Sequence, residues 1–129
     1  MSDIEPTGQP TIRTVAMPAD LNANGDVFGG WLLSQMDMAG GIAAGLRSQG
    51  RVVTVAIDAM HFHKPMHMGD VLSCYCRVEK VGTTSIAFVV SAWARRRAGG
   101  SGEKITEGRF TYVAIGPDGK KRPVPPEEA

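Results

Sequence analysis

The sequence predicts an α+β fold in which one long central helix is wrapped by a curved antiparallel sheet of about five strands. The first observation is a single long helical pattern: residues 28–47 contain no proline, and apolar residues recur there at spacings of three and four. The second is that the remaining ordered sequence is rich in valine, isoleucine, threonine and aromatic residues, divided by turn-forming residues. A chain of 129 residues is long enough to bury one core, so one folded domain is expected.

The folded domain is expected to span residues 11–116. Residues 1–10 and 117–129 are rich in proline, glycine and charge, which is typical of a flexible N-terminal segment and a C-terminal tail. The basic run at 120–122 is expected to be solvated or to touch a phosphate group bound to a neighbouring subunit. Residues 11–17 are expected to form the first strand, which Pro18 ends, and residues 18–26 to form a loop.

The long helix is expected from Phe28 to Arg47. Asp26 or the glycine pair at 29–30 is a candidate for its N-terminal cap. The predicted core-facing stripe consists of Phe28, Leu32, Met36, Ala39, Ala43 and Leu46. Further apolar residues lie outside this stripe, so the sheet should surround the helix on most sides.

Four more strands are expected at residues 51–63, 70–81, 84–96 and 104–115. The connections between them are short and rich in turn-forming residues, so we expect a meander of antiparallel neighbours. Cys74 and Cys76 are the only cysteines of the sequence. Alternate residues of a strand lie about 6.6 Å apart with side chains poorly aimed for a disulfide, so reduced, packed thiols are expected.

The charge balance of the sequence favours no class of charged partner. The sequence has 14 basic and 13 acidic residues, a formal net charge of +1, so no overall field favours nucleic acid or a membrane surface.

The sequence has no signal-like start and no apolar run of about 20 residues, and a cytoplasmic protein is expected. His61, His63 and His67 lack a cysteine or carboxylate cluster at ligand spacing, so no metal is expected.

One seam of small or polar residues follows the helix when successive residues are placed about 100° apart. It consists of Gly30, Ser34, Asp37, Gly41 and Gly45. Because an ionised carboxylate is costly to bury, Asp37 needs an explanation. Two interpretations are open at this point. The seam permits close packing while Asp37 bonds a neighbouring strand or loop, or the seam is a groove for a ligand.

The ligand interpretation depends on the start of the helix. Backbone N–H groups at Gly29 and Gly30 lack partners within the helix and carry the positive end of its dipole, so they are candidates to bind an oxyanion. Asp37 lies seven residues further on, about 10 Å along the helix axis. A site that uses both groups therefore combines Gly30 of one subunit with Asp37 of another, which predicts a dimer.

Three segments resemble one known family: "NANGDVFGGWLLSQMD", "HFHKPMHMGD" and "EKVGTTSI". They are similar to segments of the hotdog-fold acyl-CoA thioesterases, specifically the bacterial YciA type, which is related to the brain-type cytosolic acyl-CoA hydrolases of animals. The resemblance covers roughly residues 11–123. It implies a hotdog fold, pairing of two chains into one continuous sheet, further assembly that is often a trimer of dimers, and hydrolysis of acyl-CoA to a free acid and CoA.

The resemblance also implies the catalytic residues. The family's catalytic acid falls on Asp37, its loop asparagine on Asn22, and the backbone N–H that polarises the thioester carbonyl on Gly30. Asn22 would share a site with Asp37 of the opposite subunit, and Asn24 is an alternative for its role. Thioester hydrolysis needs an activated water or a carboxylate nucleophile, so Asp37 is expected to act as general base or as nucleophile.

A wider set of residues is expected to bind the acyl-CoA. Turn N–H groups, hydroxyls and strand-end cations suit phosphate, and the start of the helix offers apolar and small groups, although strand-end charges are more often simply solvated. The set is Gly29, Asn24, Phe28, Ser34, Lys80, Gly82, Thr83, Ser85 and Arg95. No cofactor is expected, because CoA is part of the substrate and product.

Two other functions are alternatives for this sequence. One is a regulatory hotdog domain that binds acyl-CoA without turnover. The other is a hotdog dehydratase or hydratase, which is expected to use a histidine and an acid at the helix. The helix contains no histidine, which counts against the second alternative.

Overall fold

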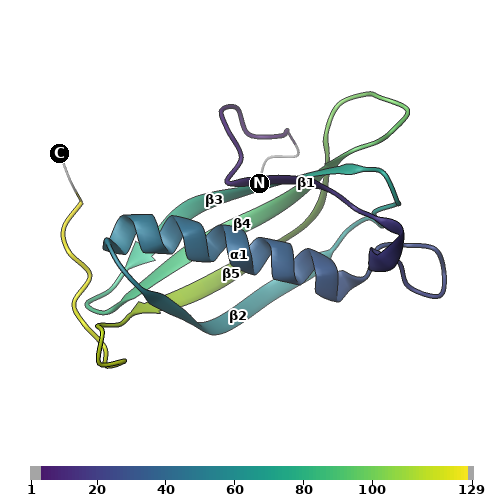
Figure 1. Cartoon of the computed structure of the whole chain (residues 1–129). Coiled ribbons are helices and arrows are strands. Elements are labelled where there is room, and N and C mark those ends of the chain that lie inside the picture. Colours follow the sequence, from purple (N-terminus) through teal and green to yellow (C-terminus); the bar gives the residue numbers. More distant parts are fainter. Residues whose placement is uncertain (1–3, 128–129) are drawn as a thin grey trace.

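The structure is a computed structural model that describes residues 4–127. Its five strands are β1 (Ile12–Val15), β2 (Val52–Phe62), β3 (Val71–Val81), β4 (Ser85–Arg95) and β5 (Glu103–Ala114). The helix α1 (Gly29–Ser48) follows a short 3-10 turn, η1 (Pro18–Asp20), and lies across one face of the curved sheet (Figure 1). The predicted α+β fold, with one long helix and an antiparallel sheet of five strands, is confirmed.

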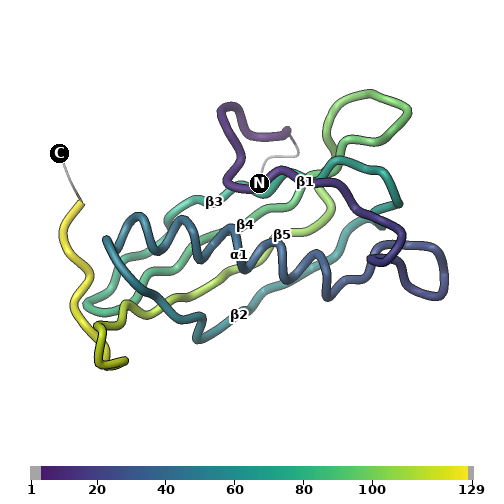
Figure 2. The backbone as a smooth tube through the Cα atoms, in the orientation of Figure 1, coloured from purple at the N-terminus to yellow at the C-terminus, as the bar shows by residue number. Residues whose placement is uncertain are grey.

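The strand order is β1-β3-β4-β5-β2, and all neighbours are antiparallel. The predicted meander is correct for β3, β4 and β5 but wrong for β2. That strand pairs with β5, from Val52 opposite Ala114 to Phe62 opposite Thr106. Residues 63–70 therefore carry the chain across the end of the sheet to β3, as Figure 2 shows. Turn-forming residues predict a change of direction, but they do not determine which strand pairs next.

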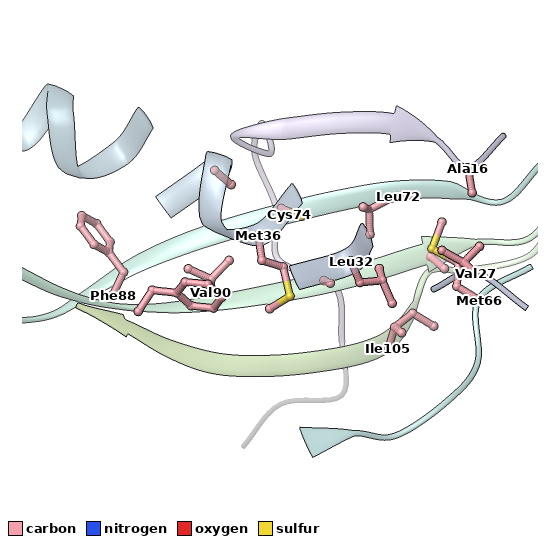
Figure 3. Packing of buried hydrophobic residues seen from close by; sticks show 14 of the residues in the cluster. Ala16, Val27, Leu32, Met36, Met66, Leu72, Cys74, Phe88, Val90 and Ile105 are labelled. Carbon is pink, nitrogen blue, oxygen red and sulfur yellow. The ribbon is translucent and has the colours of Figure 1, made fainter. Parts of the chain in front are cut away.

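The core lies between α1 and the concave face of the sheet. Leu32 and Met36 point from the helix toward Val90 and Ile105 of the sheet (Figure 3). The buried helix residues are Leu32, Met36, Ala39, Gly40, Ala44 and Ser48. The predicted stripe is wrong at its two ends, because Phe28 is 50% and Leu46 77% exposed. At 3.6 residues per turn the buried face of a long helix drifts, and here it moves from Ala43 to Ala44 and Ser48.

The N-terminal segment lies on the opposite, convex face of the sheet. Glu5 accepts a 2.6 Å hydrogen bond from the Tyr75 hydroxyl and lies 3.7 Å from the guanidinium of Arg95. A Cβ on Gly102 would overlap the Glu5 carboxylate, so this glycine makes room for the contact. Residues 4–10 therefore contact the sheet, and their expected flexibility in solution stays a prediction.

The C-terminal segment returns to the end of α1 (Figure 1). Arg122 donates hydrogen bonds to the carbonyl oxygens of Ser48 at 2.9 Å and Ile115 at 3.0 Å. Val124 N–H donates to the carbonyl of Thr83 at 2.8 Å. Arg122 of the basic run at 120–122 is thus not simply solvated, and contact of the run with a phosphate group of a neighbouring subunit stays a prediction. The guanidinium of Arg122 is engaged at the helix end, where a cation is favourable.

Candidate active site

The Asp37 carboxylate lies half-buried on α1, where the helix crosses β5 and β2. Its Oδ1 atom accepts a 2.9 Å hydrogen bond from the Tyr112 hydroxyl on β5. The same atom accepts a 2.8 Å hydrogen bond from the Thr54 hydroxyl on β2. Thr54 and Tyr112 stand opposite each other in the β2–β5 register, so both side chains project from the same face of the sheet. The carboxylate that helical spacing singled out is thus held by two hydroxyls.

Tyr112 reaches Asp37 because Gly40 makes room for it. Tyr112 is 1% exposed, and a Cβ on Gly40 would overlap its hydroxyl. Burial, together with the hydrogen bond to Asp37 and the charge of that carboxylate, raises the pKa of Tyr112 well above its ordinary value of 10.0. The phenol therefore stays protonated and acts as a hydrogen-bond donor. The seam glycine Gly41 contributes little here, since its Cβ would lie 4.0 Å from the Tyr112 ring.

The start of α1 is open. Phe28 is the N-cap residue and makes no side-chain capping bond, so the expected cap by Asp26 is wrong. Asp26 instead lies 3.2 Å from the imidazole of His67. Among residues 4–127, the N–H groups of Gly29 and Gly30 have no protein acceptor, and both residues are exposed. A Cβ on Gly30 would meet no atom within 4 Å, so its N–H is accessible to an anionic group.

Asn22 organises the loop before the helix. Its Oδ1 accepts hydrogen bonds from the backbone N–H groups of Asn24 at 2.9 Å and Asp26 at 3.1 Å. Its own backbone N–H donates to the Asp26 carbonyl at 2.7 Å. The side-chain oxygen of Asn22 is thus used inside the loop. Its side-chain NH₂ has no acceptor within the described residues and is the end that can serve a ligand. Asn24 is exposed, and its backbone N–H is used by Asn22.

Two other predicted binding residues lie near the start of α1. Phe28 is half-exposed, so its ring is accessible. Ser34 is exposed as well, but its hydroxyl donates to the Trp31 carbonyl at 2.7 Å. A cavity of about 340 Å³ adjoins this end of the helix and is lined by Gly29 and Phe62 among others. The Phe62 ring would lie 3.6 Å from a Cβ on Gly29, so this glycine leaves space beside the ring.

The predicted phosphate-binding residues do not form one group within a chain. Lys80, Gly82, Thr83 and Ser85 lie around the turn between β3 and β4, where Gly82 N–H donates to the Ser85 carbonyl at 2.7 Å. Arg95 lies at the other end of β4, about 34 Å from Ser85 at the rise of an extended strand. In one chain, Arg95 and the turn residues therefore cannot contact the same phosphate group.

The remaining candidates lie outside this region. A cavity of about 640 Å³, lined by residues such as Trp93 and Lys104, lies beneath the N-terminal segment on the convex face of the sheet.

Within residues 4–127, no three His, Cys, Asp or Glu side chains are grouped to hold a metal ion. Both cysteines are free, as predicted, and burial raises the pKa of the Cys74 thiol to about 12. None of the helices in residues 4–127 is both long and apolar enough to cross a membrane.

Sequence reasoning missed Tyr112 and Thr54. Strand alternation indicates that Tyr112 faces the helix, and a polar hydroxyl directed into a core needs a partner. The Gly40–Gly41 pair in the middle of a helix was a second signal, because mid-helix glycine is unfavourable unless another group approaches closely. The identity of the partner, however, depends on how the helix packs on the sheet.

Comparisons with known proteins agree on the family. The model of the thioesterase superfamily matches residues 24–100. The acyl-CoA thioester hydrolase YciA of Salmonella typhimurium is 52% identical over 126 residues, which cover 95% of each protein. A hexameric thioesterase from Yersinia pestis superposes with a TM-score of 0.89 at 50% identity, covering 95% of this chain and 99% of that one.

A third relative is a hexameric broad-specificity acyl-coenzyme A thioesterase, solved as a variant in which one aspartate is replaced by alanine. It superposes with a TM-score of 0.88 at 45% identity, covering 92% of this chain and 88% of that one. Sequence, domain match and three-dimensional structure thus point to the same group of enzymes. This chain belongs to the thioesterase superfamily and has its hotdog fold.

Proposed function

We propose that this chain hydrolyses acyl-coenzyme A thioesters to a free carboxylic acid and coenzyme A. The observation that carries the proposal is the half-buried Asp37 carboxylate, held by two hydroxyls in a fold whose relatives are acyl-CoA thioester hydrolases. An ionised carboxylate that is oriented in this way suits proton abstraction from water. CoA enters as part of the substrate and leaves as product, and the proposed reaction uses no separate cofactor. A cytoplasmic location stays a prediction from the sequence.

In the proposed mechanism, Asp37 takes a proton from the water that attacks the thioester carbonyl. The C–S bond of the tetrahedral intermediate then breaks, and the leaving CoA sulfur takes up the proton that Asp37 holds. The N–H of Gly30, with that of Gly29 beside it, stabilises the oxyanion, and the NH₂ of Asn22 helps to position the reacting groups. One oxyanion donor is typically worth a factor of about 10² to 10³ in turnover, and a general base about 10² to 10⁴. Direct attack by Asp37 to form a mixed anhydride uses the same groups, and we favour the general base.

We further propose that each site is shared between two chains. Gly30 and Asp37 lie about 10 Å apart along the helix, too far for one thioester carbonyl to meet both. Apolar side chains next to this region are exposed: Met38 is 50% and Ile42 48% exposed on α1, and Val55 is 55% exposed on the edge strand β2. Pairing of two β2 edges into one continuous sheet would cover these residues. The hexameric relatives favour a trimer of such dimers.

The substrate test is a panel of acyl-CoA esters of increasing chain length, with detection of the released thiol. Turnover of several chain lengths is expected. Asp37→Asn should fold and bind CoA but lose turnover by at least about a hundredfold, because the general base is removed. Binding of acyl-CoA without thiol release by the unaltered chain would instead support a regulatory domain. Near-normal turnover of Asp37→Asn would remove Asp37 from the mechanism.

The shared site has a separate test. Asp37→Asn and Asn22→Ala chains are each expected to be nearly inactive alone. When the two are unfolded together and refolded, hybrid dimers contain one site with both native residues, and activity should return. Refolding each variant alone is the control. If the mixture stays as inactive as its components, the two residues act within one chain.

A further inference from the structure

We propose that Tyr112 is a positioning residue for the reaction: its hydroxyl fixes one oxygen of the Asp37 carboxylate and leaves the other to act on water. This inference rests on the proposed function. Tyr112 donates to Oδ1 at 2.9 Å, and Thr54 donates to the same atom at 2.8 Å. Within residues 4–127, Oδ2 accepts no hydrogen bond. Two donors on Oδ1 hold the carboxylate in one orientation and leave Oδ2 free to accept a proton from water.

The Tyr112 hydroxyl is held in place more firmly than that of Thr54. Tyr112 is 1% exposed, and its ring packs edge-to-face against Phe88 with ring centroids 6.3 Å apart. Gly40 lies directly against the hydroxyl. Thr54, in contrast, is exposed on the edge strand β2. The buried phenol cannot reach substrate, so it acts through Asp37 rather than on the reacting atoms.

The Tyr112 hydroxyl also has a second acceptor on Asp37. The hydroxyl lies 3.1 Å from the backbone carbonyl oxygen of Asp37. When Asp37 takes a proton during the reaction, the phenol can turn its hydrogen toward this carbonyl. The hydroxyl therefore stays hydrogen-bonded in both protonation states of the carboxyl, and no buried donor is left unpaired during turnover.

Few other titratable groups face Asp37. From β3 the helix-facing titratable groups are the thiols of Cys74 and Cys76, and Cys76 contributes to the raised pKa of Tyr112. The side chains of β4 that face the helix are apolar. The titratable residues of β2, Asp58 and His61, stand opposite Arg109 and Glu107 and so project from the convex face. The other charged residue of α1 is Arg47, about 15 Å along the helix.

Removing the hydroxyl has a defined expected effect. Tyr112→Phe keeps the ring in the core and leaves the Asp37 carbonyl in its helical hydrogen bond. After the loss of the phenol, the hydroxyl of Thr54 on the exposed edge strand is the remaining donor to Oδ1 among the described residues, so the carboxylate is held less firmly. With Oδ2 less well oriented, kcat should fall about tenfold, whereas KM should change little.

The experiment compares Tyr112→Phe with Tyr75→Phe. Tyr75 is the other tyrosine of the chain, and it also donates to a carboxylate, that of Glu5, but on the opposite face of the sheet. The values of kcat and KM are measured for the unaltered chain and both variants. In parallel, carbon-13 NMR of labelled aspartate records the chemical shift of the Asp37 carboxylate at one neutral pH, with Asp37→Asn used to assign the signal. Circular dichroism establishes that both variants fold.

The proposal predicts that Tyr112→Phe lowers kcat about tenfold with little change in KM and moves the Asp37 carboxylate signal, and that Tyr75→Phe does neither. An unchanged Asp37 signal in Tyr112→Phe, or equal effects in Tyr75→Phe, overturns it. The NMR measurement needs no turnover. If the unaltered chain hydrolyses no acyl-CoA, the proposed function fails while the hydrogen-bonding role of Tyr112 is still decided.

Discussion

Gly40 and Gly41 are neighbours on α1, yet the structure predicts opposite effects when each is replaced by alanine. A Cβ on Gly40 would overlap the hydroxyl and the ring edge of Tyr112. A Cβ on Gly41 would come no closer than 4.0 Å to that ring, which is an ordinary van der Waals contact. Both substitutions remove a glycine from the middle of a helix, so the difference between them isolates the contact with Tyr112.

The expected magnitudes follow from these contacts. Alanine in place of glycine stabilises a helix interior by about 1 kcal/mol, and Gly41→Ala should gain about that amount. Gly40→Ala gains the same helix stabilisation, but its Cβ overpacks the core, which costs about 1–3 kcal/mol. It also displaces the hydrogen bond from Tyr112, worth about 0.5–1.5 kcal/mol. Gly40→Ala should therefore be less stable than Gly41→Ala by about 1.5–4.5 kcal/mol.

Urea denaturation followed by circular dichroism measures this difference. All samples need the same protomer concentration, because assembly changes the apparent stability. The midpoint of Gly40→Ala is expected below that of the unaltered chain, and the midpoint of Gly41→Ala above it. Gly40→Ala should also lose turnover, since Tyr112 can no longer reach Asp37 in the same geometry. Equal midpoints for the two variants would refute the packing of Tyr112 against Gly40.

Two further predictions concern charge. The ammonium group of Lys64 and the guanidinium of Arg96 lower the pKa of Glu103 from 4.5 to about 2. The stability that this carboxylate contributes is fully present above about pH 4.5 and is lost as the pH falls through about 2. Glu103→Gln should therefore flatten the plot of urea midpoint against pH in that range. An unchanged slope would contradict this prediction. Reversing the charge of Lys80 or Arg95 should raise KM for acyl-CoA, most strongly at low salt, if either contacts phosphate. An unchanged KM for both would exclude them from the CoA site.

The sequence predicted the local structure closely because periodicity is a local property. The helix was expected at Phe28–Arg47 and runs from Gly29 to Ser48. Every strand was placed within two residues of its observed bounds, since alternating β-branched and aromatic residues end at clear turn signals. The pairing of β2 with β5 was missed, because the residues that determine it lie far apart in the sequence.

The candidate site was predicted in part for the same reason. Asp37 and the open glycines at 29–30 stand out on a helical wheel, which needs only local spacing. The bond from Tyr112 to Asp37 joins residues 75 positions apart, and no local pattern reports it. Arg122 is a similar case, because its bond to Ser48 spans 74 positions and depends on the path of the C-terminal segment. Residues that support a site from a distance are those that periodicity misses.

The two ends of α1 differ in whether a side chain bonds their terminal backbone groups, and the difference supports the proposed reaction. At the C-terminal end, Arg122 donates to the Ser48 carbonyl and brings a positive charge to the negative end of the helix dipole. At the N-terminal end, no side chain among the described residues 4–127 caps the helix, and the N–H groups of Gly29 and Gly30 face solvent. An N-cap side chain would typically stabilise the helix by about 1 kcal/mol. The helix lacks this stabilisation at its N-terminal end, where the free N–H donors can bind the oxyanion of a thioester. At the C-terminal end, Arg122 anchors the helix that carries Asp37.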